Sequence, residues 1–309
     1  MLDWLLDLVG YQGQGHTVDE LTRRIGVPAE SLTKVQPDYR EFEISKRSGG
    51  TRRIAAPSPE LMELQRRILR RLLRRLRVHP AATGFERGQS FVTNACRHQG
   101  KAVVVSFDIR NFFPSITAYR VERYFRAIGW NRKAARLLVQ LLTWQERLPQ
   151  GAPTSPRLSN LVNYRMDSRL TSLAADYGAT YTRYADDITI SLDDEDHDLH
   201  SLIASTIAII RSEGYQPHIG KKFDVRRAHQ RQQVTGLVVN SQVNLPRRTR
   251  RWLRAVEHRT KQFDKALCFT QPGAFSGTQP VKRPTLDRQQ LAGWRALVQM
   301  IARQRDAAD

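Results

Sequence analysis

Three aspartates stand where carboxylates could act on one substrate. Asp108 follows an apolar, β-branched run within residues 101–109, and Asp186 and Asp187 are adjacent inside a Tyr-Ala-Asp-Asp segment. The first run predicts a buried strand that carries Asp108 at its carboxyl end. The alternating pattern over residues 180–192 predicts a hairpin with the acidic pair at its tip, where both acids can approach one site.

Carboxylates gathered in this way have a clear chemical use. Like charges side by side are costly unless a cation neutralises them, and hard oxygen ligands suit Mg²⁺, which also takes substrate phosphates as ligands. Two such ions would activate a sugar hydroxyl and stabilise a departing pyrophosphate. An isolated Asp-Asp pair is usually a turn, but its combination with a strand that ends in Asp favours catalysis.

The elements that must position these acids follow from local patterns. Residues 1–38 are predicted to form a small helical lead-in, in which Thr17 and Glu20 make a capping-box pattern and Gly26 ends a helix. This helix either docks on the main body, which we favour, or forms the first half of a helix-turn-helix. The remaining expected elements are a β-hairpin over residues 41–54, helices over 60–78, 117–129, 131–144, 157–175 and 199–213, a strand over 234–240, and basic helices from 241, interrupted over 271–284.

The composition points to a polyanionic partner. The chain of 309 residues has 50 Lys and Arg against 30 Asp and Glu, a formal net charge of +20, and 40% hydrophobic residues. A packed core is therefore expected, and so large a positive charge favours nucleic-acid binding over a generically soluble basic protein. Two cysteines exclude a disulfide framework, and the sequence has neither a signal peptide nor a membrane span, so we expect a cytoplasmic protein without membrane contact.

The helix predicted over residues 60–78 carries its charge on one face. Its leucines and Ile68 make an apolar stripe, and six arginines lie opposite, with one nearby acid, Glu63. These arginines either face solvent or face phosphates, and their number favours phosphates. We take Arg70 and Arg74 as the residues that test this choice.

Four motifs, in order over residues 40–240, resemble those of the reverse transcriptases. The Tyr-Ala-Asp-Asp segment looks like their catalytic box, and the segment Phe107 to Phe113 looks like the first palm motif. The segment Gln150 to Pro156 looks like the Gln-Gly-x-x-x-Ser-Pro motif near the incoming nucleotide. The run Thr51 to Ile54, followed by Pro57, looks like the fingers hairpin.

Two further elements resemble the bacterial retron reverse transcriptases in particular. Residues 94–98 match an Asn-Ala-x-x-His element, and residues 234–236 match a Val-Thr-Gly element. Each element alone is weak, because His98 could be a core histidine and Thr235-Gly236 an ordinary strand edge. Both at the expected places favour the retron type.

The resemblance implies a role for each residue of the catalytic centre. Asp108, Asp186 and Asp187 would bind two Mg²⁺ or Mn²⁺ ions, with the Ile109 carbonyl as a further ligand. Lys221, or the adjacent Lys222, would donate a proton to pyrophosphate, although His218 stands where the family usually has Asn and weakens the local match.

The resemblance also implies residues that bind nucleotide and RNA. Phe113 occupies the position of a steric gate against ribonucleotides, unless it is plain core packing. The other nucleotide-binding candidates are Lys46, Arg52, Arg53, Gln150 and Gly151. The RNA-binding candidates are Asn94, His98, Arg70, Arg74, Val234, Thr235, Gly236, Arg250 and Trp252, of which Trp252 is as well explained as a core residue.

The resemblance implies an α+β right-hand polymerase fold, with fingers, palm and thumb and an antiparallel palm sheet. The expected division is a helical N-terminal lead-in over 1–38, fingers and palm over 39–240 and a thumb over 241–309. The expected function is RNA-directed DNA synthesis from deoxynucleoside triphosphates on a cognate structured non-coding RNA. Priming from an internal 2′-OH would give a branched RNA–DNA hybrid, in anti-phage defence with a separate effector protein.

Two other functions stay open. One is another prokaryotic reverse transcriptase, of the group II intron-like or the diversity-generating type. The sequence shows no maturase or endonuclease region, which argues against the group II intron type. The other is a catalytically idle RNA-binding module, which the intact set of three aspartates disfavours.

Overall fold

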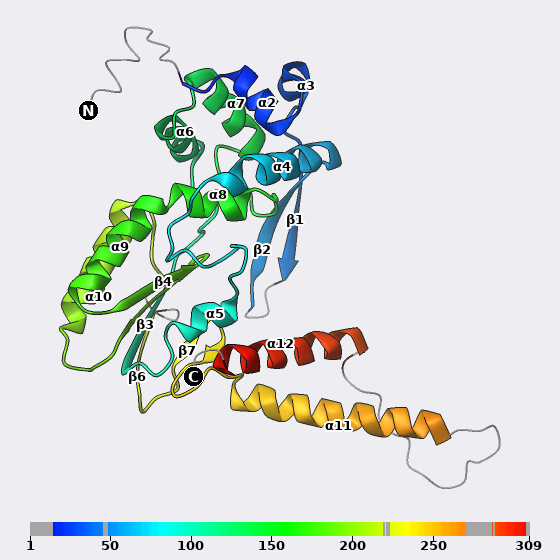
Figure 1. Cartoon of the computed structure of the whole chain (residues 1–309), viewed down its shortest axis with the longest axis vertical. Coiled ribbons are helices and arrows are strands. Elements are labelled where there is room, and N and C mark those ends of the chain that lie inside the picture. Colours follow the sequence, from blue (N-terminus) through cyan, green and yellow to red (C-terminus); the bar gives the residue numbers. More distant parts are fainter. Residues whose placement is uncertain are drawn as a thin grey trace. The chain divides into compact units, whose positions relative to one another are not determined.

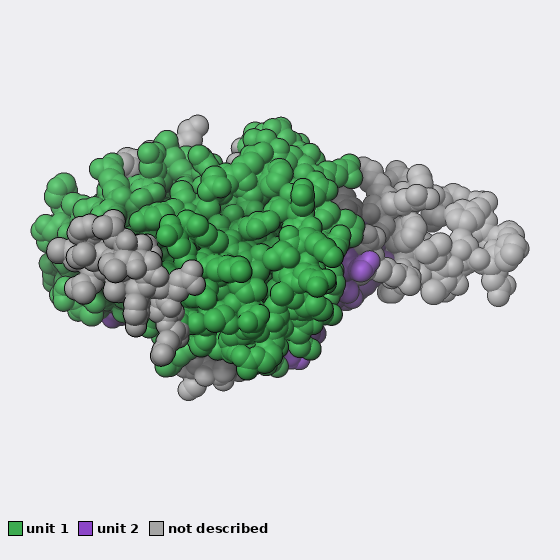
Figure 2. Space-filling view, turned by 90° about the horizontal axis from the view of Figure 1, so that it is seen from above, with its two compact units in different colours: residues 1–90, 106–190, 196–224 green, residues 91–105, 191–195, 225–309 purple. Residues whose placement is uncertain are grey.

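The structure is a computed structural model that describes residues 15–45, 49–218, 220, 223–269, 286 and 288–306. Two compact units divide the chain (Figure 2). Unit 1 comprises residues 1–90, 106–190 and 196–224, and unit 2 comprises residues 91–105, 191–195 and 225–309. Each unit draws on distant parts of the sequence, so we describe each by itself.

The described part of unit 1 starts with two short helices, the expected α2 (Val18–Ile25) and a second one, α3 (Ala29–Lys34). The Thr17 hydroxyl accepts from the Glu20 amide at 3.3 Å, and Gly26 ends α2 with φ of 67°, as the capping pattern predicts. α2 buries Leu21 and contacts helices α4 (Pro59–Arg71) and α7 (Arg132–Leu142). The helix is therefore docked within unit 1, as we favoured.

The first hairpin pairs β1 (Tyr39–Ser45) with β2 (Thr51–Pro57) in antiparallel register, with Phe42 opposite Ile54. The helix predicted over 60–78 is shorter than expected. α4 ends at Arg71 and a 3-10 turn follows over Leu73–Arg75. The turn lets the adjacent residues Leu72 and Leu73 both be buried, whereas neighbours on a straight α-helix point about 100° apart.

The central sheet has four strands in the order β4-β5-β3-β6. β3 (Val103–Asp108) is buried along nearly its whole length, and β4 (Thr180–Tyr184) with β5 (Asp187–Leu192) forms the predicted hairpin. The fourth strand is β6 (Asp224–Arg227), and the boundary between the units passes through β3, β5 and β6. Helix α9 (Tyr164–Asp176) packs against β4 and against α10 (Leu199–Ser212), as Figure 1 shows.

The helix expected over residues 157–175 is in fact two helices. α8 (Ser155–Val162) starts two residues early, with Pro156 in its first turn, and α9 follows directly after Asn163. The Asn163 side chain is fully buried, and its Oδ1 accepts from Arg120 Nη2 at 3.0 Å and from the Tyr215 hydroxyl at 2.7 Å. This tertiary bonding fixes the break. α6 (Ala118–Ala127) and α7 lie close to their expected ranges.

Unit 2 contains α5 (Phe91–Cys96), a short hairpin of β7 (Gln233–Val234) with β8 (Leu237–Val238), and the helices α11 (Arg247–Phe269) and α12 (Arg288–Asp306). The single strand predicted over 234–240 is wrong, because the chain reverses at Thr235 and Gly236, which have φ of 47° and 85°. Two successive positive φ values are typical of a type I′ hairpin turn. The apolar core of unit 2 joins α5, this hairpin and α12.

The interruption predicted over residues 271–284 lies outside the described residues. Among the helices that the structure does describe, none combines the length and the apolar character that a membrane span requires.

Candidate active site

The three aspartates lie at one edge of the central sheet. β3 ends at Asp108, β5 begins at Asp187, and the two strands are neighbours. The Ile109 amide donates to the Asp186 carbonyl at 3.0 Å, so the hairpin tip is bonded to the residue that follows Asp108. Asp108 is only 7% exposed, whereas Asp187 is exposed. The predicted juxtaposition of the acidic pair with Asp108 is confirmed at the level of the backbone.

A third segment borders Asp108. The His218 amide donates to the Asp108 carbonyl at 2.7 Å, and the Arg110 amide donates to the Gln216 carbonyl at 2.9 Å. Because β3 is fixed on both sides, the position of Asp108 is set by hydrogen bonds that no local sequence pattern encodes. Over the described part of the chain, no three Asp, Glu, His or Cys side chains gather as a group that could hold a metal ion. The backbone therefore brings the three acids to one edge of the sheet, while their carboxylates are not gathered into a metal site there.

Arg183 is the residue beneath the hairpin tip that sequence reasoning missed. Its side chain is fully buried, and Nε and Nη2 each donate to a carboxylate oxygen of Asp167 at 2.7 Å. Nη1 donates to the Ala185 carbonyl at 3.1 Å, inside the tip itself. Ala185 has φ of 59°, so this bond supports a left-handed residue directly before the acidic pair.

In the buried Asp167–Arg183 pair, each charge is compensated by the other. Burial alone would lower the pKa of the Arg183 guanidinium, but the Asp167 charge and its hydrogen bonds outweigh burial and raise that pKa. The Tyr181 hydroxyl also donates to Asp167, at 2.8 Å, and burial followed by the Asp167 charge raises the pKa of Tyr181 well above its usual value. The guanidinium therefore stays charged and oriented below the tip.

The segment 81–86 is hydrogen-bonded to β4 of the β4–β5 hairpin. The Arg183 amide donates to the Ala81 carbonyl at 2.8 Å, and the Thr83 amide donates to the Arg183 carbonyl at 2.9 Å. A Cβ placed on Gly84 would lie 2.8 Å from the Ala185 amide nitrogen, so only glycine permits this approach. Sequence reasoning missed this segment, although its Gly84 was a possible signal of close packing.

The loop with Gln150 and Gly151 packs on the first hairpin. The Ala55 amide of β2 donates to the Gln150 carbonyl at 2.9 Å. Gly151 has φ of 138°, and a Cβ there would lie 2.6 Å from the Ala55 carbonyl oxygen. The two motifs that the nucleotide-binding prediction combined are therefore in direct contact.

The basic candidates of that pocket differ in their surroundings. Arg52 is exposed on β2, whereas Arg53 donates from Nη2 to Glu41 Oε2 at 2.6 Å. Phe113 is half-buried, with its ring 5.4 Å from that of Phe112, so both of its expected roles stay open. Lys46, Lys221 and Lys222 lie outside the described residues.

The side chains of Asn94 and His98 are buried in unit 2, with exposures of 1% and 0%. His98 Nδ1 shares a hydrogen bond of 2.7 Å with the Ser191 hydroxyl, and burial, followed by the charges of Lys101 and Arg97, lowers its pKa to about 3. Neither side chain reaches the surface in this structure, and the direct contact with RNA that we expected of them stays a prediction. The alternative of a core histidine is the better description of His98.

The Val-Thr-Gly element forms the β7–β8 turn. Val234 is 1% exposed, and the Thr235 hydroxyl donates to the Phe91 carbonyl at 2.8 Å. Gly236 is exposed, and a Cβ there would meet no atom within 4 Å. The glycine permits the positive φ of the turn, and its role in RNA binding stays a prediction.

The arginine face of α4 and the following turn is exposed as predicted. Arg70 is paired with Glu63 at 3.0 Å, and Arg67 Nη1 donates to the Gly26 carbonyl at 3.1 Å. Arg74 is exposed as well. The face therefore offers charge at the surface, although part of it is already neutralised.

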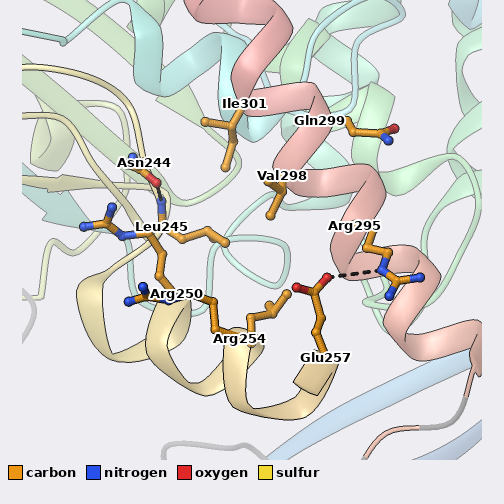
Figure 3. Close-up of a pocket in the computed structure, with 10 residues that line it drawn as sticks. Asn244, Leu245, Arg250, Arg254, Glu257, Arg295, Val298, Gln299 and Ile301 are labelled. Carbon is orange, nitrogen blue, oxygen red and sulfur yellow. Dashed lines mark hydrogen bonds and ion pairs between the residues drawn. The ribbon is translucent and has the colours of Figure 1, made fainter. Parts of the chain in front are cut away.

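Arg250 and Trp252 lie on α11 in unit 2. Arg250 borders a cavity of about 550 Å³ between α11 and α12, which an ion pair of 3.1 Å from Arg295 to Glu257 closes on one side (Figure 3). The half-buried Trp252 packs edge-on against Trp294 at 5.6 Å. Trp294 is partly buried and packs against the core of unit 2, so Trp252 has an apolar packing partner, and its two expected roles both stay open.

Comparisons with known proteins show the family of this chain. Residues 44–231 match the family described as reverse transcriptase (RNA-dependent DNA polymerase). The chain is 41% identical over 238 residues to the retron Mx65 reverse transcriptase of Myxococcus xanthus, covering 71% of this chain and 55% of that one. It is 35% identical over 226 residues to the retron Ec86 reverse transcriptase of Escherichia coli, covering 71% and 69%.

The fold has a distant counterpart among solved structures. A telomerase from Candida albicans, solved with a fragment of telomeric RNA, superposes with a TM-score of 0.52 at 11% identity, covering 75% of this chain and 51% of that one. At this identity the likeness concerns the polymerase fold alone. The chain spans about half the length of the Myxococcus relatives that it matches.

Proposed function

Because this chain belongs to the reverse transcriptase family, and within it to the retron reverse transcriptases, we propose that it is an RNA-directed DNA polymerase that copies a cognate structured RNA. The observation that carries the proposal is the placement of Asp108 beside the Asp186-Asp187 tip, inside the segment that matches the family. The catalytically idle alternative would require this edge of the sheet to be dispensable.

The donor set fits divalent cations. Carboxylate oxygens are the ligands that Mg²⁺ prefers in proteins, and the backbone brings three carboxylate residues to one edge of the sheet. Asp108, Asp186 and Asp187 would hold two Mg²⁺ or Mn²⁺ ions, with the Ile109 carbonyl as a further ligand. Such ions supply Lewis acidity to the attacking hydroxyl and the leaving pyrophosphate. Lys221 is our candidate for the proton that pyrophosphate takes up.

The protein's own residues would orient the deoxynucleoside triphosphate. Arg52 is exposed and carries a planar cation suited to phosphate, with Arg53 on the same strand and Lys46 as our further candidates for this contact. Gln150 and Gly151 pack against β2, so they would line the pocket next to these cations. Phe113 would crowd a ribose 2′-OH and so favour deoxynucleotides.

The retron relatives suggest how synthesis starts. We propose priming from an internal 2′-OH of the cognate RNA, which yields a branched RNA–DNA hybrid, and a role in anti-phage defence with a separate effector protein. The reaction would take place in the cytoplasm, where the RNA is transcribed. The exposed arginines of α4, together with Arg250, would contact RNA phosphates.

The catalytic proposal is tested by Asp186→Asn and Asp187→Asn. Each variant should lose DNA synthesis on an annealed RNA template by at least about a thousandfold, because a metal ligand is removed. RNA binding should survive, because it rests on distributed Lys and Arg. Asp176→Asn, at the exposed end of α9, is the matched control and should be fully active. Substantial synthesis by either tip variant would refute the assignment.

Priming is tested separately, by co-expression with the neighbouring RNA gene. We expect DNA whose 5′ end stays attached to a ribonucleotide until a debranching enzyme releases it. A free or 3′,5′-linked 5′ end would refute the retron type of initiation and leave the general polymerase proposal intact.

A further inference from the structure

Phe85 is an unusual residue beside the candidate active site. Its φ is 65°, in the left-handed region, and its side chain is 45% exposed. A bulky aromatic residue with positive φ is a genuine outlier, since glycine or asparagine adopts this conformation at lower cost. Neither feature benefits the folded state by itself.

The ring of Phe85 lies between two residues of the candidate site. Its centroid is 6.2 Å from that of Phe113, the candidate gate, and 6.2 Å from that of Tyr184, the first residue of the Tyr-Ala-Asp-Asp segment. The interplanar angles are 43° and 39°, so the three tilted rings form a continuous aromatic wall. Because the middle ring is nearly half exposed, this wall presents apolar surface that another molecule can cover.

Neighbouring contacts hold the backbone of Phe85 in place. The Asn160 side-chain amide donates to the Gly84 carbonyl at 2.7 Å and to Glu86 Oε1 at 2.8 Å, one contact on each side of Phe85. Glu86 is in turn ion-paired with Arg157. The strained conformation is therefore imposed by the surroundings, which is the usual mark of strain kept for function.

We propose that Phe85 is a nucleotide-binding residue, whose ring packs against the sugar and base of the incoming deoxynucleoside triphosphate and completes the wall begun by Phe113. This inference rests on the proposed function. Every base and sugar offers an apolar face to such a ring, so the contact serves all four deoxynucleotides alike. It also supports the Phe113 ring from the side, which makes Phe85 a determinant of sugar specificity.

The test uses variants that remove the ring but suit the backbone. Phe85→Asn and Phe85→Gly both tolerate positive φ, so the midpoint of thermal unfolding should hold or rise. The KM for each deoxynucleotide in RNA-templated extension should rise roughly five- to a hundredfold, as expected when one aromatic stacking contact is lost. The preference for deoxynucleotides over ribonucleotides should fall. The Kd for the annealed primer–template should not change.

Phe85→Tyr keeps the ring and should restore KM to near the wild-type value. Tyr119→Ala is the control for loss of an exposed aromatic side chain, since Tyr119 is 67% exposed on α6. An unchanged KM in Phe85→Asn, in an enzyme whose wild type synthesises DNA, would refute the role of Phe85 and leave the polymerase proposal standing. Failure of both Phe85→Asn and Phe85→Gly to fold would also refute it, because the ring would then be structural. A weaker Kd for primer–template with an unchanged KM would assign the ring to the primer instead.

Discussion

Removal of one partner from the buried Asp167–Arg183 pair should be strongly destabilising. Both side chains are 0% exposed, and two hydrogen bonds of 2.7 Å join them. In Asp167→Asn the guanidinium would stay buried without its counter-charge, and the Tyr181 hydroxyl would lose a charged acceptor. The expected cost in the free energy of unfolding is about 3–5 kcal/mol. This cost corresponds to a fall of about 6–20 °C in the midpoint of thermal unfolding.

Urea unfolding followed by circular dichroism measures this cost, and the exposed ion pair of Glu195 with Arg227 supplies the control. These two side chains are 42% and 43% exposed, so Glu195→Gln should change stability by at most about 1 kcal/mol. A loss below about 1 kcal/mol in Asp167→Asn would refute the conclusion that Asp167 holds a desolvated charge.

A double variant separates stability from positioning. Replacement of both partners by apolar residues, as in Asp167→Leu with Arg183→Met, removes both buried charges and should recover much of the lost stability. It does not restore the bond from Arg183 Nη1 to the Ala185 carbonyl. DNA synthesis by the folded double variant should therefore stay low, with a higher Mg²⁺ concentration needed for half-maximal rate. A stable double variant with wild-type activity would show that Arg183 serves folding alone.

Three further variants test other parts of the structure. Burial lowers the pKa of His98 from about 6.5 in the unfolded chain to about 3 in the folded protein, so His98 contributes stability above pH 6.5 that is lost as the pH falls, at up to about 1.4 kcal/mol per pH unit. In His98→Gln the difference in unfolding free energy between pH 7.5 and 5.5 should therefore be smaller than in the wild type. Equal differences would contradict a buried neutral histidine. Gly151→Ala would bring a methyl group to 2.6 Å from the Ala55 carbonyl, so the KM for deoxynucleotides should rise, and an unchanged KM would show that this contact does not shape the pocket. Replacement of Arg70 and Arg74 by Glu should weaken RNA binding. The slope of the logarithm of the binding constant against the logarithm of the salt concentration should fall in magnitude by up to about 0.9 for each lost phosphate contact. An unchanged slope would mean that the arginine face is only solvated.

The elements that carry the acids were predictable because their signals are local. The Thr17 cap and the Gly26 stop encode a helix within ten residues, and both behave as expected. The apolar run before Asp108 lies within one strand and the alternation around the Tyr-Ala-Asp-Asp segment within one hairpin, and the structure confirms both elements. Once the hairpin pairs with the buried strand, few placements of the acids other than one shared edge of the sheet remain.

The departures arise where distant contacts overrule local patterns. Residues 157–175 are helical by composition, but Asn163 bonds to Arg120 and Tyr215 and divides the helix. The same holds for His98, which has donors and acceptors suited to RNA but is enclosed by the core of unit 2. Side-chain chemistry shows what a residue can do, whereas burial decides whether a ligand can reach it.

The support of the hairpin tip shows why the catalytic acids are easier to predict than the residues that hold them. The acids stand at the ends of locally encoded strands, and they need only a shared edge of the sheet to meet. Arg183 is four residues from Asp187, yet its partners come from Asp167 and from the segment 81–86, which is about a hundred residues away. An arginine inside a strand pattern looks like an exposed residue, because a buried guanidinium is rare unless a carboxylate meets it. Only the tertiary fold brings that carboxylate to the guanidinium. The identity of the acidic residues is therefore encoded locally, whereas their exact positions are encoded by long-range contacts.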